Sequence, residues 1–98
     1  RNVGEARRFI KPRIPLCEGA FGPNGEELLK MRYRYATTLF DDPARSVDDL
    51  TEALLILEDV APRFRRVFGI SHPLSGKAQG AVRMTQSALA RARASQET

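Results

Sequence analysis

The sequence predicts an all-α fold of about four helices arranged as antiparallel pairs. Three observations point to it: apolar residues recur with helical spacing along the chain, capping residues and stops delimit the helices, and the chain matches itself at an offset of 47 residues. The 98 residues are 42% hydrophobic and 29% charged, which is the composition of a folded domain. We therefore expect residues 1–98 to be a single helical-repeat segment of about two helix pairs, part of a longer array.

The first helix is predicted over about residues 5–19. Its apolar positions follow helical spacing and comprise Ala6, Phe9, Ile10, Ile14 and Cys17. Pro12 and Pro15 lack the backbone N–H group that a helix interior uses, so they weaken the second half of this helix.

The second helix is predicted to start after Asn24, which is expected to cap it while Glu27 reaches back from the third helical position. It extends to Phe40, and Asp41-Asp42-Pro43 ends it because the residue before a proline is pushed out of the helical region. Its buried stripe comprises Leu28, Met31, Tyr35, Ala36 and Leu39.

The third helix, residues 46–68, has signals at both ends. Ser46 and Asp49 match a capping box, and Gly69 supplies the stop. Pro62 lies inside the span, but the apolar phase continues through it, so we expect one bent helix rather than two. Its acidic half precedes its basic half, the order that the helix dipole favours. The apolar stripe comprises Leu50, Ala53, Leu54, Leu57, Ala61, Phe64, Val67 and Phe68.

The fourth helix is predicted to begin at Pro73, directly after the loop residue His72. Gly76 and Gly80 keep its first half slim enough for close packing. Its stripe comprises Leu74, Ala78, Ala81, Val82, Thr85, Ala88, Leu89 and Ala92.

The internal match places residues 5–22 over residues 52–69. An interior proline recurs, Pro15 with Pro62, and both segments end in Phe-Gly. At this offset, the predicted start of the second helix after Asn24 falls close to the predicted start of the fourth helix at Pro73, so the repeating unit is a helix pair. Such pairs stack into a solenoid because each leaves an apolar face that only its neighbour can cover. The faces expected to meet carry Ala6, Ile10, Ala53, Leu54 and Leu57.

These helix pairs resemble tetratricopeptide repeats. Four residues stand at the first-helix positions of that family: Leu28, Met31, Arg32 and Tyr35. Two pairs stand at the second-helix positions: Ala53 with Leu57, and Ala6 with Ile10. The linker from Phe68 to Leu74 looks like that of the kinesin-light-chain-type subgroup, although Arg32 replaces a small residue and the unit exceeds the ~34 residues typical of the family. The resemblance implies a tetratricopeptide-like α-solenoid fragment that acts as a protein–protein interaction scaffold or adaptor.

The face expected to bind a partner protein or peptide depends on Tyr33. Two residues apart on a helix are turned by about 200°, so Tyr33 is expected to be exposed while Tyr35 is buried. The alternative is that Tyr33 packs against the adjacent helix. In tetratricopeptide-like stacks the first helix of each pair lines the concave side, so the resemblance extends this face to the fourth helix. The complete set is Leu29, Lys30, Tyr33, Thr37, Lys77, Gly80 and Met84.

No catalytic, cofactor or metal site is predicted, and we do not expect an enzyme. His72 has no second metal ligand in helical register, and its position suits helix initiation. Cys17 falls on an apolar stripe and is expected to be buried and inert. The carboxylates between Asp48 and Asp59 suit helix capping and a solvated face rather than acid–base catalysis.

The alternative function is a basic helical module that docks on nucleic acid or within a large assembly. The net charge of +4 is segregated, because residues 46–61 carry only acids whereas residues 1–16 and 62–98 are rich in bases. Six bases could contact phosphates: Arg7, Arg8, Lys11, Arg63, Arg65 and Arg66. The competing interpretation is a solvated or salt-bridged basic face, because aromatic residues are only 7% of the chain and no nucleic-acid-binding motif occurs.

The sequence also bears on compartment. No apolar run approaches the ~20 residues of a membrane span. A single cysteine suits a reducing intracellular compartment, which we take to be the cytoplasm, with an organelle interior as the alternative.

Overall fold

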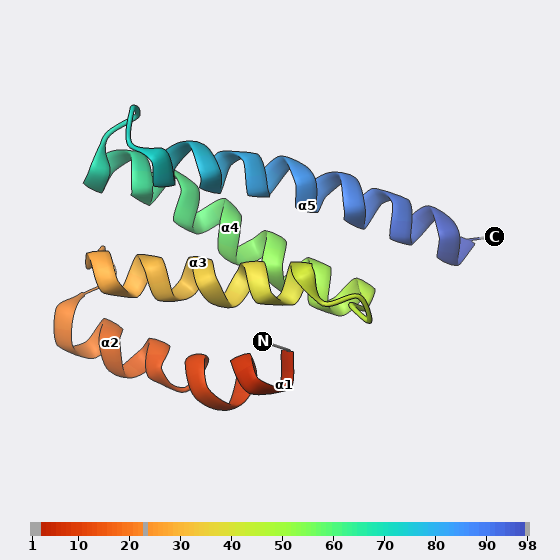
Figure 1. Ribbon diagram of the computed structural model, residues 1–98, viewed down its shortest axis with the longest axis horizontal. Helices are drawn as coiled ribbons and strands as arrows, with labels where there is room; N and C mark the ends of the chain where they lie inside the picture. Colours follow the sequence, from red (N-terminus) through yellow and green to blue (C-terminus); the bar gives the residue numbers. More distant parts are fainter. Residues whose placement is uncertain (1–2, 23, 98) are drawn as a thin grey trace.

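The computed structural model describes residues 3–22 and 24–97, and every regular element within these ranges is helical. The elements are α1 (Val3–Glu5), the π-helix η1 (Ala6–Ile10), α2 (Arg13–Phe21), α3 (Glu26–Asp41), α4 (Val47–Phe68) and α5 (Pro73–Glu97). Successive long helices run in opposite directions across a slab of 45 × 31 × 18 Å (Figure 1). The prediction of an all-helical chain is confirmed for these residues, with the first expected helix divided into α1, η1 and α2.

The two prolines explain why the first helix is divided. Pro12 lies in the turn between η1 and α2, where its missing N–H group interrupts the hydrogen-bond ladder. Pro15 lies in the first turn of α2, where no N–H donor is needed. Cys17 on α2 is only half-buried, so the prediction of a buried thiol is wrong. The reason is that α2 lies at the edge of the array, where only α3 and η1 cover it.

The start of α3 differs from the sequence prediction. Gly25 is the N-cap, without a side-chain capping bond, so Asn24 is not the cap. The side chain of Asn24 instead accepts a hydrogen bond from Arg63 at 2.7 Å, which ties this loop to α4. The end of α3 agrees with the prediction within one residue, because Asp42 adopts an extended conformation before Pro43.

The capping box at the start of α4 is confirmed. Ser46 Oγ accepts a hydrogen bond from the Asp49 backbone N–H, and the Asp49 carboxylate accepts one from the Ser46 N–H, each at 3.0 Å. The helix continues through Pro62 without a break, as predicted, whereas the bend at Pro62 stays a prediction. Gly69 ends α4 at φ 93°, a conformation that favours glycine.

The start of α5 also follows the sequence prediction. The Leu74 N–H donates a hydrogen bond to His72 Nδ1 at 3.1 Å, and Pro73 is the first helical residue. The His72 imidazole stacks on the Phe68 ring at a centroid distance of 4.7 Å. This contact fixes the turn that reverses the chain between α4 and α5.

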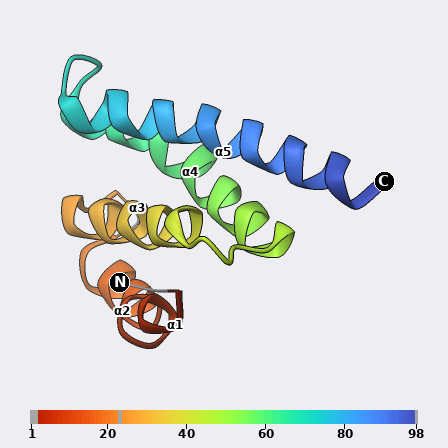
Figure 2. The ribbon, with the colours of Figure 1, turned by 45° about the vertical axis from the view of Figure 1, so that its right-hand side comes forward.

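The hydrophobic core is centred on α4, which crosses between α3 and α5 (Figure 2). Both neighbours pack along α4 and contact each other far less. Of the residues predicted to join the two units, Ile10, Ala53 and Leu57 belong to one buried cluster, and Leu54 packs against it. The side chain of Ala6 lies outside the described residues. A smaller cluster joins the start of α4 to the far part of α5 through Leu50, Ala88 and Leu89.

We expect Leu57→Ala to lower the free energy of unfolding by about 2–5 kcal/mol, because it empties a fully buried site at the centre of the core. Leu55 on the same helix is 65% exposed, so Leu55→Ala should change stability by no more than about 0.5 kcal/mol. Chemical denaturation followed by circular dichroism measures both. Equal effects of the two substitutions would contradict the assignment of the α4 faces.

Candidate functional site

A cleft between α3 and α5 collects most of the side chains predicted for partner binding. It has a volume of about 540 Å³. Its α3 wall consists of Tyr33, Thr37, Phe40 and Asp41, and Leu57 of α4 contributes from the core. Its α5 wall consists of Lys77, Gly80, Ala81, Met84 and Thr85. Five of the seven predicted residues thus surround one cleft: Tyr33, Thr37, Lys77, Gly80 and Met84.

A second hollow of about 370 Å³ lies next to this cleft, beside the start of α5. It is lined by Lys30, Tyr33, Arg34, Thr37 and Leu74. Tyr33 and Thr37 line both hollows, and we call the two adjacent hollows together the α3–α5 groove. Lys30 is the sixth predicted residue at this groove, and its ammonium group also lies 5.8 Å from the centroid of the Phe68 ring.

The groove exists because α4 holds α3 and α5 apart and because α5 presents small residues there. A Cβ atom added to Gly80 would meet no heavy atom within 4 Å, apart from its own helix backbone and chain neighbours. Gly80 therefore leaves open space where another residue would place a side chain, and it borders both this cleft and a further hollow that Arg65 and Arg83 line. Thr85, although buried, satisfies its hydroxyl within α5 by donating to the Ala81 carbonyl at 2.7 Å.

Tyr33 is half-buried and packs against the core, so the prediction that it is exposed is wrong. Its ring lies 5.8 Å from that of Phe64 on α4, in a tilted arrangement that aromatic pairs favour. Burial raises the pKa of its hydroxyl, and the negative charge of Asp41 raises it further. Tyr35 is buried, as predicted. Tyr33 therefore packs against the adjacent helix, the alternative considered above, and also lines the groove.

Leu29 was predicted to lie on the partner-binding face, and this placement is wrong. Its side chain is 0% exposed and belongs to the main core. The physical reason is that α3 packs against η1 and α2 as well as against α4. A helix between two neighbours buries a wider face than a single stripe. The adjacent pair Leu28-Leu29 is the sequence signal of that wider face, since neighbouring positions are turned by about 100°.

Sequence reasoning missed several groove residues. Most of them had been assigned to buried stripes, and Asp41 had been assigned to a helix end. Periodicity predicts which face of a helix is apolar, but it does not predict where two helices diverge and leave part of that face open. The missed residues are Arg34, Phe40, Asp41, Leu57, Leu74, Ala81 and Thr85.

Outside the groove, a polar network centred on Glu52 joins the N-terminal segment to α3 and α4. The Glu52 carboxylate accepts hydrogen bonds from Tyr35 Oη at 2.8 Å, Lys11 Nζ at 3.1 Å and Arg7 Nη2 at 3.3 Å. Arg7 also donates to Asp49 at 2.8 Å. Burial by itself would raise the pKa of Glu52, but the hydrogen bonds from Tyr35, Lys11 and Arg7 outweigh it and lower the pKa.

A second network centred on Asp59 joins α3 to α4. Arg32 Nη1 donates to Asp59 at 2.7 Å and Arg63 Nε donates at 3.1 Å. Burial opposes ionisation of this carboxyl group, yet the two guanidinium groups hold its pKa below the ordinary value. The segregated charges of the sequence therefore partly neutralise one another between helices.

The six bases considered for phosphate binding fall into two groups. Arg7, Lys11 and Arg63 form salt bridges with acids of this chain, which agrees with the salt-bridged interpretation for these three. The other three are exposed and have no acidic partner among the described residues: Arg8, Arg65 and Arg66. Within residues 3–22 and 24–97, no group of three or more His, Cys, Asp or Glu side chains could hold a metal ion.

Comparison with known proteins yields no match to a protein-family model, to a curated protein or to a solved structure. In the part of the chain that the structure describes, no helix combines the length and the apolar character needed to cross a membrane. The functional conclusion therefore depends on the geometry of the α3–α5 groove.

The Glu52 network predicts a pH-dependent stability. A carboxyl group whose pKa is lowered in the folded state stabilises the fold above its unfolded pKa, about 4.3 for glutamate, and this contribution is lost as the pH falls through the lowered value. We expect Glu52→Gln to be less stable than the parent at pH 7 and to lose less stability between pH 5 and pH 3. Denaturant unfolding at several pH values measures this.

Glu58→Gln is the matched control, since Glu58 is exposed on the same helix and forms no ion pair with the described residues. Its pH dependence should equal that of the parent. A Glu52→Gln variant with the parent's full pH dependence would show that the network does not contribute to folding.

Proposed function

We propose that the chain is a segment of a tetratricopeptide-like α-solenoid and that it binds a peptide or helix of a partner protein in the α3–α5 groove. The observation that carries this proposal is that α3 and α5, which begin 47 residues apart at Glu26 and Pro73, both line the α3–α5 groove. In helical-repeat arrays, equivalent helices of successive units create the extended concave binding surface.

The ends of the preceding helices support the same repeat. Both α2 and α4 end in a phenylalanine, Phe21 and Phe68, again 47 residues apart. The glycine that follows has a positive φ in each case, 81° at Gly22 and 93° at Gly69. Each glycine donates its backbone N–H to the carbonyl four residues earlier. The recurrence of this local geometry at the sequence offset favours two successive helix-pair units.

The chemistry of the groove suits a peptide. Its apolar part is formed by Phe40, Leu57, Ala81 and Met84. Its polar rim is formed by Asp41, Lys30 and Lys77. An apolar centre with a polar rim is the usual anatomy of a protein interface. Met84 is 59% exposed, and its flexible thioether side chain can adapt to different partner surfaces.

A peptide library displayed on phage tests this proposal. We expect selected peptides to bind the parent chain and to lose at least tenfold in affinity with Gly80→Leu, because the new side chain occupies the hollow. The substitution should not unfold the chain, since nothing lies within 4 Å of a Cβ at this position and leucine favours a helix by about 1 kcal/mol over glycine.

Gly76→Leu is the control for this experiment. Gly76 lies one turn earlier in α5, has equally open surroundings and does not line the groove. Peptides that bind Gly80→Leu as tightly as the parent, or a library that yields no binders, would contradict the groove assignment.

Docking on nucleic acid is the second candidate function, and one observation favours it. Arg65 and Arg83 line a hollow of about 280 Å³ between α4 and α5, and neither has an acidic partner among residues 3–22 and 24–97. If this surface binds phosphates, generic single-stranded RNA should be retarded at low salt, with an affinity that falls steeply as salt increases.

On the peptide-binding proposal, we expect no RNA retardation at about 150 mM salt, the physiological ionic strength. Gel-shift titrations of the parent and of the Arg65→Gln/Arg83→Gln double variant measure this. Retardation at physiological salt that the double variant abolishes would establish the nucleic-acid function instead.

A further inference from the structure

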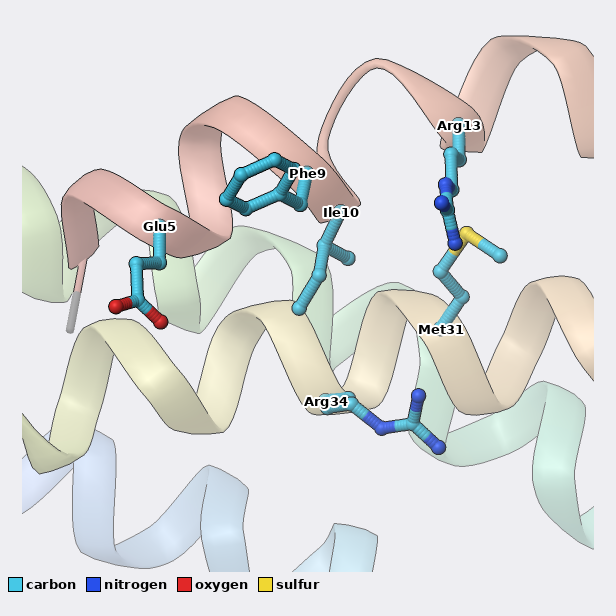
Figure 3. Close-up of a pocket in the computed structure, with 6 residues that line it drawn as sticks. All are labelled: Glu5, Phe9, Ile10, Arg13, Met31 and Arg34. Carbon is cyan, nitrogen blue, oxygen red and sulfur yellow. The ribbon is translucent and has the colours of Figure 1, made fainter. Parts of the chain in front are cut away.

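A separate pocket lies between η1, the start of α2 and α3 (Figure 3). Its volume is about 280 Å³, and it is lined by Glu5, Phe9, Ile10, Arg13, Met31 and Arg34. The groove function makes no use of five of these side chains, since only Arg34 also borders the groove.

The middle of the pocket is apolar. Phe9 and Ile10 lie between Glu5 and Arg13 in Figure 3, with Ile10 directed towards α3. Ile10 is buried in the core and Met31 packs against that core, whereas Phe9 is 57% exposed. Phe9 therefore offers an aromatic ring at the edge of an apolar wall without being required to fill the core.

One end of the pocket is positively charged. Arg13 and Arg34 lie on the side away from Glu5 in Figure 3. Within residues 3–22 and 24–97, neither guanidinium group has an acidic partner, although Arg7, Lys11, Arg32 and Arg63 all form salt bridges with acids. Two guanidinium groups are thus available to an external anion at a pocket with an apolar wall.

We propose that this pocket binds a small aromatic anion, either an aryl phosphate or an arylalkyl carboxylate. A guanidinium group matches the oxygens of a phosphate or carboxylate with paired hydrogen bonds, so the anionic group pairs with Arg13 and Arg34. The ring of the ligand lies against Phe9, Ile10 and Met31, where aromatic contacts add to apolar burial.

The size and charge of the pocket restrict the ligand. A volume of about 280 Å³ is slightly below that of typical drug-sized sites and suits a single ring with one substituent. A molecule with one ring and one anionic group therefore matches the apolar wall and the charged end of this pocket.

The test is a titration of the full chain, isotope-labelled for nuclear magnetic resonance, with phenyl phosphate, phenylacetate, phenol and inorganic phosphate. We expect at least one of the two aromatic anions to shift the signals of Phe9, Ile10 and Met31, and the better of the two to bind at least tenfold more tightly than either phenol or inorganic phosphate. Equal binding of phenol or of inorganic phosphate, shifts centred elsewhere, or no shifts up to about 10 mM would overturn the proposal.

Variants separate the specific site from general charge attraction. Arg13→Gln/Arg34→Gln should weaken binding at least tenfold, whereas Arg66→Gln/Arg91→Gln, which removes the same net charge from exposed positions elsewhere, should leave it unchanged. Phe9→Ala should also weaken binding, and circular dichroism should show an unchanged helix content because the ring is exposed. Equal losses in both arginine pairs, or full binding by Phe9→Ala, would refute the site.

Discussion

The burial of α4 between two other helices is the constraint on which the rest of the structure depends. Leu57, Val60 and Phe64 are fully buried, and each buried side chain of this size contributes about 1.5–3 kcal/mol. No single neighbour covers a face that wide, so α3 and α5 each cover part of it and make few contacts with one another. The α3–α5 groove is the space left by this arrangement.

Aromatic and ionic contacts then fix the elements around α4. Tyr33, Phe64, Phe68 and His72 follow one another in successive ring contacts, which connect the groove wall to the core and to the start of α5. Exposed ion pairs contribute little stability individually, but Glu52 accepts hydrogen bonds from η1, from the turn that follows it and from α3, and so fixes where the N-terminal segment lies. That placement also puts Phe9 and Arg13 beside α3.

Part of the candidate groove could be predicted, and the errors have physical causes. Thr37, selected by its helix face beside Tyr33, lines the cleft, as do Lys77 and Met84, which were selected from the resemblance to stacked repeats. Their role in binding stays a prediction. Leu29 was misplaced because α3 has helices on two sides, a fact that the sequence signals only through the adjacent pair Leu28-Leu29. Asn24 was expected to cap α3, but a distant arginine, Arg63, competes for its side chain. Such long-range partners leave no local signal.

The sequence by itself determined the three long helices, the capping at Ser46 and His72, and the glycine stop at Gly69, because these depend on interactions within a few residues. Only the tertiary structure decided which charges are paired, how far Tyr33 is buried and where the groove and the η1–α3 pocket open. These features depend on the angles and separations between helices, which follow from how whole side-chain surfaces pack together rather than from the spacing of residues along any one helix.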